Sequence, residues 1–193
     1  MRSIDLEKEA EINIKKSRFI SILIPFNNNM KVNDIINKYK QKYKNASHYT
    51  YAFITLDEKK YSDDNEPAMT AGLPILEELE KNQLTNVLCI VIRYYGGIKL
   101  GTGGLRRAYK DATVKVIKEA TLKKLILSKI IEITFDYEKT NELDEIIKEF
   151  EIIEKTYQEN VYMKLNIPIN FNIEKLKSKT LTFMEKEKAF ILK

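Results

Sequence analysis

The sequence predicts an α+β protein of two domains. The chain has 193 residues, a length that suits one large domain or two small ones. Up to residue 128, strand-like segments alternate with amphipathic helical segments. From there the order becomes strand, helix, strand, strand, helix, strand. We therefore place the boundary near Ser128, with domains of residues 1–128 and 129–193.

The charge of the chain is also unevenly distributed. Residues 1–128 contain 22 Lys and Arg against 15 Asp and Glu, a balance of +7, whereas residues 129–193 contain 11 against 13, a balance of −2. The basic first part is compatible with nucleic acid or another polyanion as partner, although a lysine-rich composition also serves solubility.

Composition limits the location and the redox chemistry of the protein. The N-terminal MRSIDLEKEAEI has charges where a signal peptide has its apolar core, and no apolar run is long enough to cross a bilayer. We therefore expect a cytoplasmic protein that has no membrane partner. Cys89 is the single cysteine and lies in an apolar run, where a buried small hydrophobic residue is expected rather than a nucleophile.

The first elements form a hairpin followed by a helix. Residues 10–15 alternate weakly and residues 19–25 are apolar, which predicts two strands joined by a turn at Ser17 and Arg18. Helical spacing with Asn29 as a plausible cap predicts the next helix, whose apolar positions are Val32, Ile35, Ile36 and Tyr39.

A strand and a second helix follow. Residues 48–55, HYTYAFIT, are rich in β-branched and aromatic residues and indicate a strand. Residues 62–67 have the composition of a loop. Beyond them, Pro74 suits a first helical turn and Thr70 is a candidate cap for the amphipathic segment that begins at Ile75.

The central stretch is VLCIVIRYYGGIKLGTGGLRRAYKDATVKVIKEA, residues 87–120. Residues 87–92 indicate a buried strand, and five of the six glycines of the chain follow within residues 96–104. The period then becomes helical, with an apolar stripe at Leu105, Ala108, Ala112, Val116 and Ala120.

A glycine-rich loop between a strand and a helix has the local geometry of an anion site, because glycines allow close backbone approach and the first helical turn presents free N–H groups. Cations coincide with the glycines, and we favour a phosphate or RNA site over an alternative in which the glycines only form tight turns and the arginines are solvated. The candidate residues are Arg93, Lys99, Gly101, Gly103, Gly104, Arg106, Arg107 and Lys110. Neither the P-loop nor the dinucleotide fingerprint fits this spacing.

A second set of residues is the candidate for the wall of a cleft beside this loop. Its members are His48, Asp64, Glu66, Thr70, Tyr94 and Tyr95. If the acidic loop at residues 62–67 meets the basic glycine loop at residues 96–104, the contact is either a structural ion pair or a cleft with acceptors on one wall. The two tyrosines are either stacking platforms or core residues. The only histidine with its neighbouring acids lacks the spacing of a metal centre, so we expect no metal site.

The second domain begins with a strand at residues 125–137. A helix over residues 140–150, capped by Thr140 or Asn141, is followed by strands at 152–157 and 161–169. A helix from residue 172 to about residue 186 and a short strand at 189–192 complete the pattern. This βαββαβ order predicts a ferredoxin-like domain, in which we find no catalytic constellation.

Four segments carry a family resemblance. RYYGGIKLGTGGLRRAY resembles the RYFGG-x-LG-x-GGL-x-RAY signature of the YigZ/IMPACT family, and SDDNEPAMTAGLPIL resembles its DDGEP-x-x-TAG-P-IL segment. SRFI at residues 17–20 and ASHYTYAF at residues 46–53 occur in the family's order. Asn65 stands where the family usually has glycine, but asparagine tolerates the left-handed conformation, so we expect the turn to survive. Ala68 and Met69 replace a frequent Ser-Gly and are expected to narrow a pocket there.

The resemblance implies a first domain like domain 2 of ribosomal protein S5 and a ferredoxin-like second domain, a pairing similar to the last two domains of elongation factor G. The IMPACT branch is a translational regulator that acts through protein partners. We therefore expect a non-enzymatic protein without cofactor or catalytic residues that binds RNA, the ribosome or a translation-associated protein. Two alternatives are a phosphate- or nucleotide-binding enzyme of the S5-like fold and a pure protein-interaction adaptor.

Overall fold

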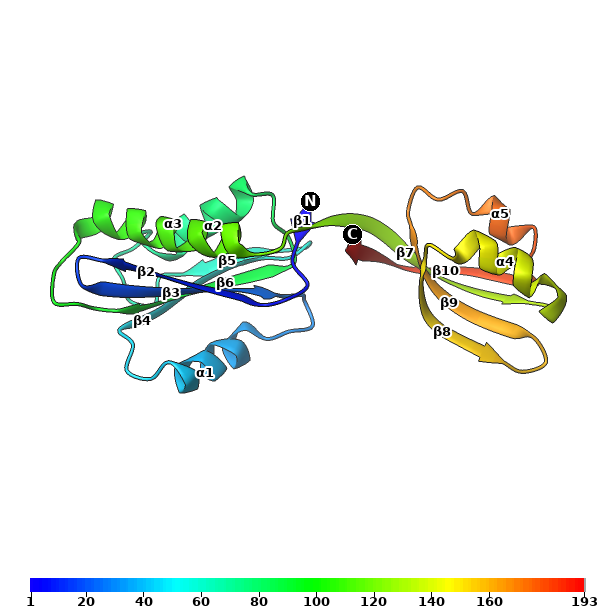
Figure 1. Ribbon diagram of the computed structural model, residues 1–193, viewed down its shortest axis with the longest axis horizontal. Helices are drawn as coiled ribbons and strands as arrows, with labels where there is room; N and C mark the ends of the chain where they lie inside the picture. The colour runs from blue at the N-terminus through cyan, green and yellow to red at the C-terminus, as the bar shows by residue number, and fades with distance from the viewer. Residues whose placement is uncertain (193) are drawn as a thin grey trace. The chain divides into compact units, whose positions relative to one another are not determined.

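The computed structural model describes residues 1–192 and divides into two compact units, Met1–Lys124 and a second that begins at Leu125 (Figure 1). This division precedes the boundary expected near Ser128. Strand β7 (Lys123–Phe135) explains the difference, because its first two residues pair with β1 (Arg2–Ser3) in the first unit. The remainder of β7 pairs within the second unit.

The first unit is built on an antiparallel sheet with the strand order β2-β3-β6-β4-β5. The strands are β2 (Lys8–Ile14), β3 (Ser17–Pro25), β4 (His48–Ile54), β5 (Lys59–Ser62) and β6 (Val87–Tyr94). The predicted hairpin is confirmed as β2 and β3, but its turn is at Lys15 and Lys16, which have positive φ values, so the turn expected at Ser17 and Arg18 was wrong: both residues already pair with β2. Strand β5 was not expected from the sequence. Strand β6 lies at the centre of the sheet and is buried along nearly its whole length.

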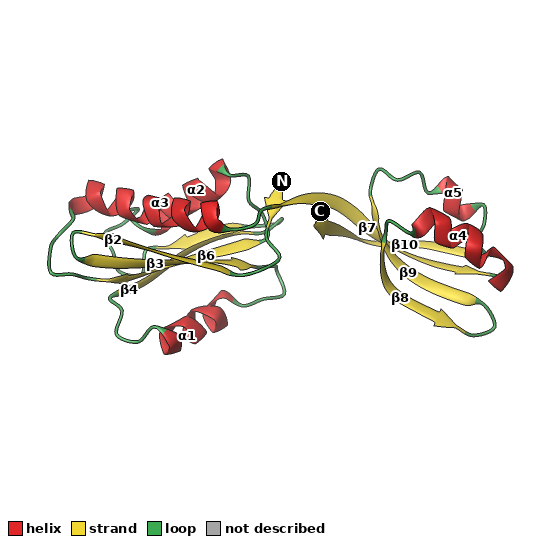
Figure 2. Ribbon diagram, in the orientation of Figure 1, coloured by secondary structure: helices red, strands yellow, loops and turns green. Residues whose placement is uncertain are grey.

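Helices cover both faces of this sheet, with α2 and α3 on one side and α1 on the other (Figure 2). The helices are α1 (Val32–Lys42), α2 (Gly72–Lys81) and α3 (Gly101–Glu119). Side chains of β6 alternate between the two cores: Cys89 and Val91 pack with α2 and α3, whereas Leu88 and Ile90 pack with α1. Two-sided burial explains why the strand is a continuous apolar run.

The helix caps differ from those expected from the sequence. Helix α1 begins after Lys31 and α4 (Thr140–Ile147) begins after Lys139, and no side chain among residues 1–192 caps either helix, so the expected caps at Asn29 and at Thr140 or Asn141 were wrong. Thr70 donates its hydroxyl proton to the Pro67 carbonyl oxygen instead of capping α2. Capping candidates are common in polar segments, and the folded backbone decides which of them reaches a free N–H group.

The second unit has the predicted ferredoxin-like βαββαβ order. Its sheet runs β10-β7-β9-β8 and is antiparallel throughout. The further strands are β8 (Glu151–Tyr157), β9 (Val161–Pro168) and β10 (Thr182–Leu192), and the helical elements are η1 (Tyr137–Lys139), α4 (Thr140–Ile147) and α5 (Glu174–Lys177). Both α-helices lie on one face of the sheet (Figure 2). The fold class is therefore confirmed as α+β with two domains.

The long helix expected from residue 172 to about residue 186 was wrong. Helix α5 has only four residues, and the following segment joins the sheet as β10. Strand β10 pairs with β7 across its length, with one irregularity between Glu185 and Lys188. The helix-favouring residues Glu185–Lys188 fall at this irregularity, so sheet pairing overrides their local preference. Within residues 1–192, no helix combines the length and apolar character needed to cross a membrane.

Candidate anion-binding site

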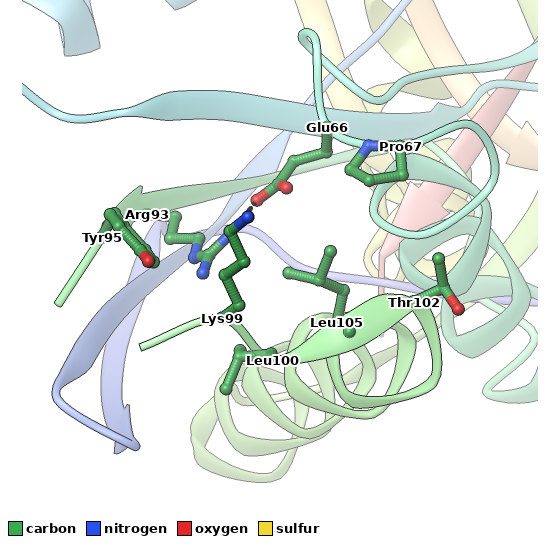
Figure 3. Close-up of a pocket in the computed structure, with 9 residues that line it drawn as sticks. Glu66, Pro67, Arg93, Tyr95, Lys99, Leu100, Thr102 and Leu105 are labelled. Atoms are coloured by element: carbon green, nitrogen blue, oxygen red, sulfur yellow. Dashed lines mark hydrogen bonds and ion pairs between the residues drawn. The ribbon is translucent and has the colours of Figure 1, made fainter. Parts of the chain in front are cut away.

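The acidic loop and the glycine loop meet at a pocket of about 270 Å³ in the first unit (Figure 3). Glu66 and Pro67 form one wall, and Arg93 and Tyr95 at the end of β6 form another. The lining contributed by the glycine loop and the start of α3 consists of Lys99, Leu100, Gly101, Thr102 and Leu105. The site thus combines the two loops whose contact the sequence left open.

A buried ion pair joins the acidic loop to the end of β6. Arg93 Nη1 donates to Glu66 Oε1 at 2.6 Å, with only 5% of Arg93 and 8% of Glu66 exposed. The Tyr109 hydroxyl of α3 donates to the same oxygen at 2.7 Å. Burial and the charge of Glu66 raise the pKa of Tyr109 well above its ordinary value, so the hydroxyl keeps its proton and remains a donor. The carboxylate is therefore held from two sides.

Arg93 is further enclosed by aromatic rings. Its guanidinium carbon lies 5.5 Å from the ring centroid of Phe19 and 5.3 Å from that of Tyr95. Nη2 donates to Ser17 Oγ at 3.4 Å, but Nε has no hydrogen-bond partner within residues 1–192. A buried guanidinium N–H without an acceptor is unusual, and here it belongs to a residue that lines the pocket.

His48 and Asp64 stand behind Glu66 rather than in the pocket. His48 Nδ1 donates to the Asp64 carbonyl oxygen at 2.8 Å, which turns Nε2 towards Glu66 Oε1 at 3.7 Å. Asp64 Oδ2 accepts from the Tyr49 N–H at 2.6 Å. Asn65 has a φ of +66°, so the expected left-handed turn is confirmed. The described residues contain no group of three side chains that could hold a metal ion.

The start of α3 has the features of an anion site. No side chain caps its N-terminus among the described residues, and its first turn contains no acidic residue. Lys99 precedes the helix, is exposed and has no ion-pair partner within residues 1–192. Its side chain extends from the glycine loop towards the Glu66–Arg93 pair (Figure 3). Free N–H groups and a lysine therefore face the same pocket.

Three glycines of the loop are required by the conformation or the close approach of the backbone. Gly97 and Gly101 have φ values of +83° and +70°, which favour glycine. A Cβ at Gly96 would lie 2.0 Å from the Lys16 carbonyl oxygen. The tight-turn alternative thus accounts for these three positions. Gly103 differs, because its φ is not positive and a Cβ there would meet no atom within 4 Å.

Three of the predicted anion-binding residues lie elsewhere. Arg106, Arg107 and Lys110 line a separate pocket of about 400 Å³ between α2 and α3. Arg106 donates to the Met69 carbonyl oxygen at 2.7 Å and to both Glu77 carboxylate oxygens at 3.0 and 3.1 Å. Six of the eight predicted residues are therefore divided between two pockets, Gly103 and Gly104 line neither of them, and Arg106 is already engaged.

Two of the predicted wall residues are also outside the first pocket. The Tyr94 side chain lies on the α1 face of the sheet, where its hydroxyl donates to the Lys44 carbonyl oxygen at 3.2 Å. Thr70 is buried and is not among the residues that line the pocket. Tyr95 is the first residue after β6 and lines the pocket, whereas Tyr94 does not, so the alternation of side chains along the strand continues one residue past its end.

Sequence reasoning missed three residues that shape the site. Asp63 accepts from the N–H groups of Ala71 and Gly72 at 2.9 Å through Oδ1, and from Met69 at 2.8 Å through Oδ2, and so fixes the acidic loop to the start of α2. Asp63 precedes Gly72, the first residue of α2, by nine positions, so the usual capping signal of an acid next to the helix was absent. Ser17 Oγ accepts from the Gly96 N–H, and Tyr109 holds Glu66.

Comparisons with known proteins agree with this fold and these motifs. The family model described as the Impact N-terminal domain matches residues 15–117. The chain is 35% identical over 158 residues to the IMPACT family member YvyE of Bacillus subtilis, covering 79% of this chain and 73% of that protein. An IMPACT family member of Haemophilus influenzae is 34% identical over 164 residues, or 81% of this chain and 80% of the relative.

Two further comparisons cover most of the chain. IMPACT family member YigZ of Escherichia coli is 28% identical over 162 residues, or 80% of this chain and 79% of that protein. A solved structure titled as that of a hypothetical protein aligns with a TM-score of 0.68 and 26% identity, over 92% of this chain and 89% of that one. The chain is thus a two-domain α+β protein with an Impact N-terminal domain. It belongs to the IMPACT family.

Proposed function

We propose that this protein binds RNA, free or within the ribosome, through the pocket at the start of α3 and that it regulates translation in the cytoplasm. One observation carries the proposal: one pocket is lined by the start of α3 and Lys99, which have no side-chain cap and no ion-pair partner within residues 1–192, and by the buried Arg93. Backbone N–H groups and cations together are the groups that bind phosphate.

Tyr95 favours RNA over a simple phosphate ligand. Its ring covers Arg93 on one side, yet 46% of the residue is exposed at the rim of the pocket. Single-stranded RNA is commonly bound by aromatic side chains that stack on unpaired bases beside a cationic groove. A phosphate at α3 and a base on Tyr95 would use both features of the pocket.

The charge of the first unit supports the same proposal. Residues 1–128 have a net charge of +7. Four lysines lie in the C-terminal half of α1 and just after it, namely Lys38, Lys40, Lys42 and Lys44. A positive field of this kind raises the rate at which a polyanion meets the protein. The family resemblance supports the translation apparatus as the partner in this proposal, either its RNA or a protein associated with it.

The test is binding of fluorescent single-stranded RNA and of purified ribosomes across a salt series. Wild type is compared with Lys99→Ala and with Lys118→Ala, a control that removes the same charge from the far end of α3. We expect log K to fall linearly with log salt, with a slope that is about 0.7 shallower for Lys99→Ala because one phosphate contact is lost. Lys118→Ala should keep the wild-type slope.

A wild-type protein that binds neither RNA nor ribosomes at low salt would contradict the proposal. Equal salt slopes for wild type and Lys99→Ala, with RNA still bound, would place the RNA away from this pocket. The first outcome turns attention to protein partners, which the adaptor hypothesis predicts.

A further inference from the structure

We infer that the pocket recognises a ribose phosphate, with the second carboxylate oxygen of Glu66 accepting the sugar 2′-hydroxyl, and that it therefore selects RNA over DNA. This inference rests on the proposed function, because it assigns a ligand to the same pocket.

The two oxygens of Glu66 have different surroundings. Oε1 accepts from Arg93 at 2.6 Å and from Tyr109 at 2.7 Å. No group within residues 1–192 donates to Oε2, which is also absent from the four enclosed side-chain atoms that lack a partner. Since Glu66 lines the pocket, Oε2 is available to a ligand there. An ionised carboxylate only accepts, so the ligand has to bring a donor.

The charges of the pocket require an anion on the same ligand. Arg93 offsets the charge of Glu66, whereas Lys99 and the start of α3 have no acidic partner within residues 1–192. A bare phosphate would meet the α3 N–H groups but would be repelled by Oε2. A hydroxyl compound without a phosphate would leave the positive wall unused.

The size of the pocket places both groups on one small unit. At about 270 Å³ it lies just below the roughly 300–1,000 Å³ typical of sites for small ligands, so an anion and a donor hydroxyl must be only a few bonds apart. A ribose phosphate meets this condition. Its 2′-hydroxyl is the group by which proteins distinguish RNA from DNA.

The ligand-side test uses wild-type protein and three oligouridines of about twelve nucleotides, with ribose, deoxyribose or 2′-fluororibose. The fluorinated strand keeps a ribose-like sugar pucker but cannot donate from the 2′ position. We expect both modified strands to bind at least about tenfold more weakly than RNA, the size of one lost hydrogen bond to a charged group. Equal affinities would overturn the inference while leaving polyanion binding intact.

A second measurement distinguishes free nucleotide from polymer. Thermal unfolding is followed with millimolar uridine 5′-monophosphate, its deoxy analogue or inorganic phosphate. Greater stabilisation by the ribonucleotide supports ribose recognition even if no strand binds, in which case the proposed RNA function fails alone. If neither nucleotide stabilises the protein and no strand binds, both proposals fail.

The protein-side test is Glu66→Gln. This substitution retains the shape of the side chain but replaces one of the two carboxylate oxygens with an amide NH2 group, which donates. Lys99→Ala is the comparison. Lys99→Ala should weaken RNA and DNA by the same factor, whereas Glu66→Gln should reduce the RNA-to-DNA affinity ratio towards one. A ratio unchanged in a folded Glu66→Gln variant would overturn the assignment of Oε2, and the 2′-fluoro comparison decides the matter if that variant does not fold.

Discussion

Arg93 and Glu66 form an ion pair that joins the centre of the sheet to the acidic loop, with 2.6 Å between Nη1 and Oε1. Arg93 ends the buried part of β6, and Glu66 follows a left-handed turn after β5. Neither group has much access to water. The pair therefore both fixes the loop and sets the charge of the pocket wall.

Removing one member of this pair should destabilise the first unit strongly. In Glu66→Leu, Arg93 is left buried without a counter-charge, and we expect a loss of about 3–5 kcal/mol in the free energy of unfolding. In Glu66→Leu/Arg93→Met no buried charge remains, so the double variant should lose less than the sum of the single variants. Urea unfolding gives the free energy of unfolding of wild type, Glu66→Leu, Arg93→Met and the double variant. Additive losses would show that the pair does not act as a unit.

The sequence predicted those parts of the fold that depend on long local patterns. The apolar run of β6, the hairpin of β2 and β3 and the stripe of α3 have one period each over many residues. The segment that becomes β10 has no such pattern around Glu185–Lys188, and its structure depends on pairing with β7, which is distant in sequence. Short strand β5 likewise depends on β4.

The contact between the two loops could be anticipated from the sequence, but the partner of each acidic side chain could not. Asp63, Asp64 and Glu66 lie within four positions and are chemically similar, yet each has a different role. Asp63 binds backbone N–H groups at α2, Asp64 binds the Tyr49 N–H, and Glu66 binds Arg93. The left-handed conformations of Asp64 and Asn65 decide this division, and the sequence indicates only that such a turn is tolerated.

Asp63 should matter more to stability than the predicted cap Thr70. Asp63→Ala removes the acceptor of three backbone N–H groups, and we expect a loss of about 1–2 kcal/mol, towards the upper end for a helix cap. Thr70→Val keeps the shape of a buried side chain and removes one hydroxyl donor, for which about 1 kcal/mol is expected. Urea unfolding of the two variants gives the order. A larger loss for Thr70→Val would contradict the assigned roles.

Alanine substitutions at two glycines, Gly103 and Gly96, should change the stability of the protein in opposite directions. Gly103→Ala should stabilise the protein by about 0.5–1 kcal/mol, because alanine is favoured in a helix and a Cβ there meets nothing within 4 Å. Gly96→Ala should destabilise it by at least about 1–3 kcal/mol, because the new Cβ would lie 2.0 Å from the Lys16 carbonyl oxygen. Thermal and urea unfolding both report the sign. Destabilisation by Gly103→Ala would point to strain in the first turn of α3.

Cys89 predicts a pH dependence at high pH. Burial raises the pKa of its thiol to about 12, whereas an unfolded thiol titrates near 8.5. Between these values the unfolded chain binds fewer protons than the folded one, so the free energy of unfolding should fall by up to about 1.4 kcal/mol per pH unit as pH rises. Urea unfolding of wild type and Cys89→Ala from pH 8 to pH 11 isolates the contribution of the thiol, since the buried tyrosines affect the pH dependence of both proteins equally. If the free energy of unfolding fell equally with pH in wild type and Cys89→Ala, the prediction would be contradicted.

Glu77 should restrain RNA binding through Arg106. Its carboxylate engages Arg106 Nη2 at 3.0 and 3.1 Å beside the pocket that Arg107 and Lys110 also line. If the proposed RNA binding is correct, Glu77→Ala frees this guanidinium and should tighten RNA binding and steepen the salt slope by up to about 0.7, the value for one additional phosphate contact. Glu145→Ala removes an exposed acid from the second unit and is the control for net charge. Glu77→Ala/Arg106→Ala should return to the wild-type slope, because the freed cation is then absent. If the double variant instead binds as tightly as Glu77→Ala, the gain comes from lost repulsion by the carboxylate and not from Arg106.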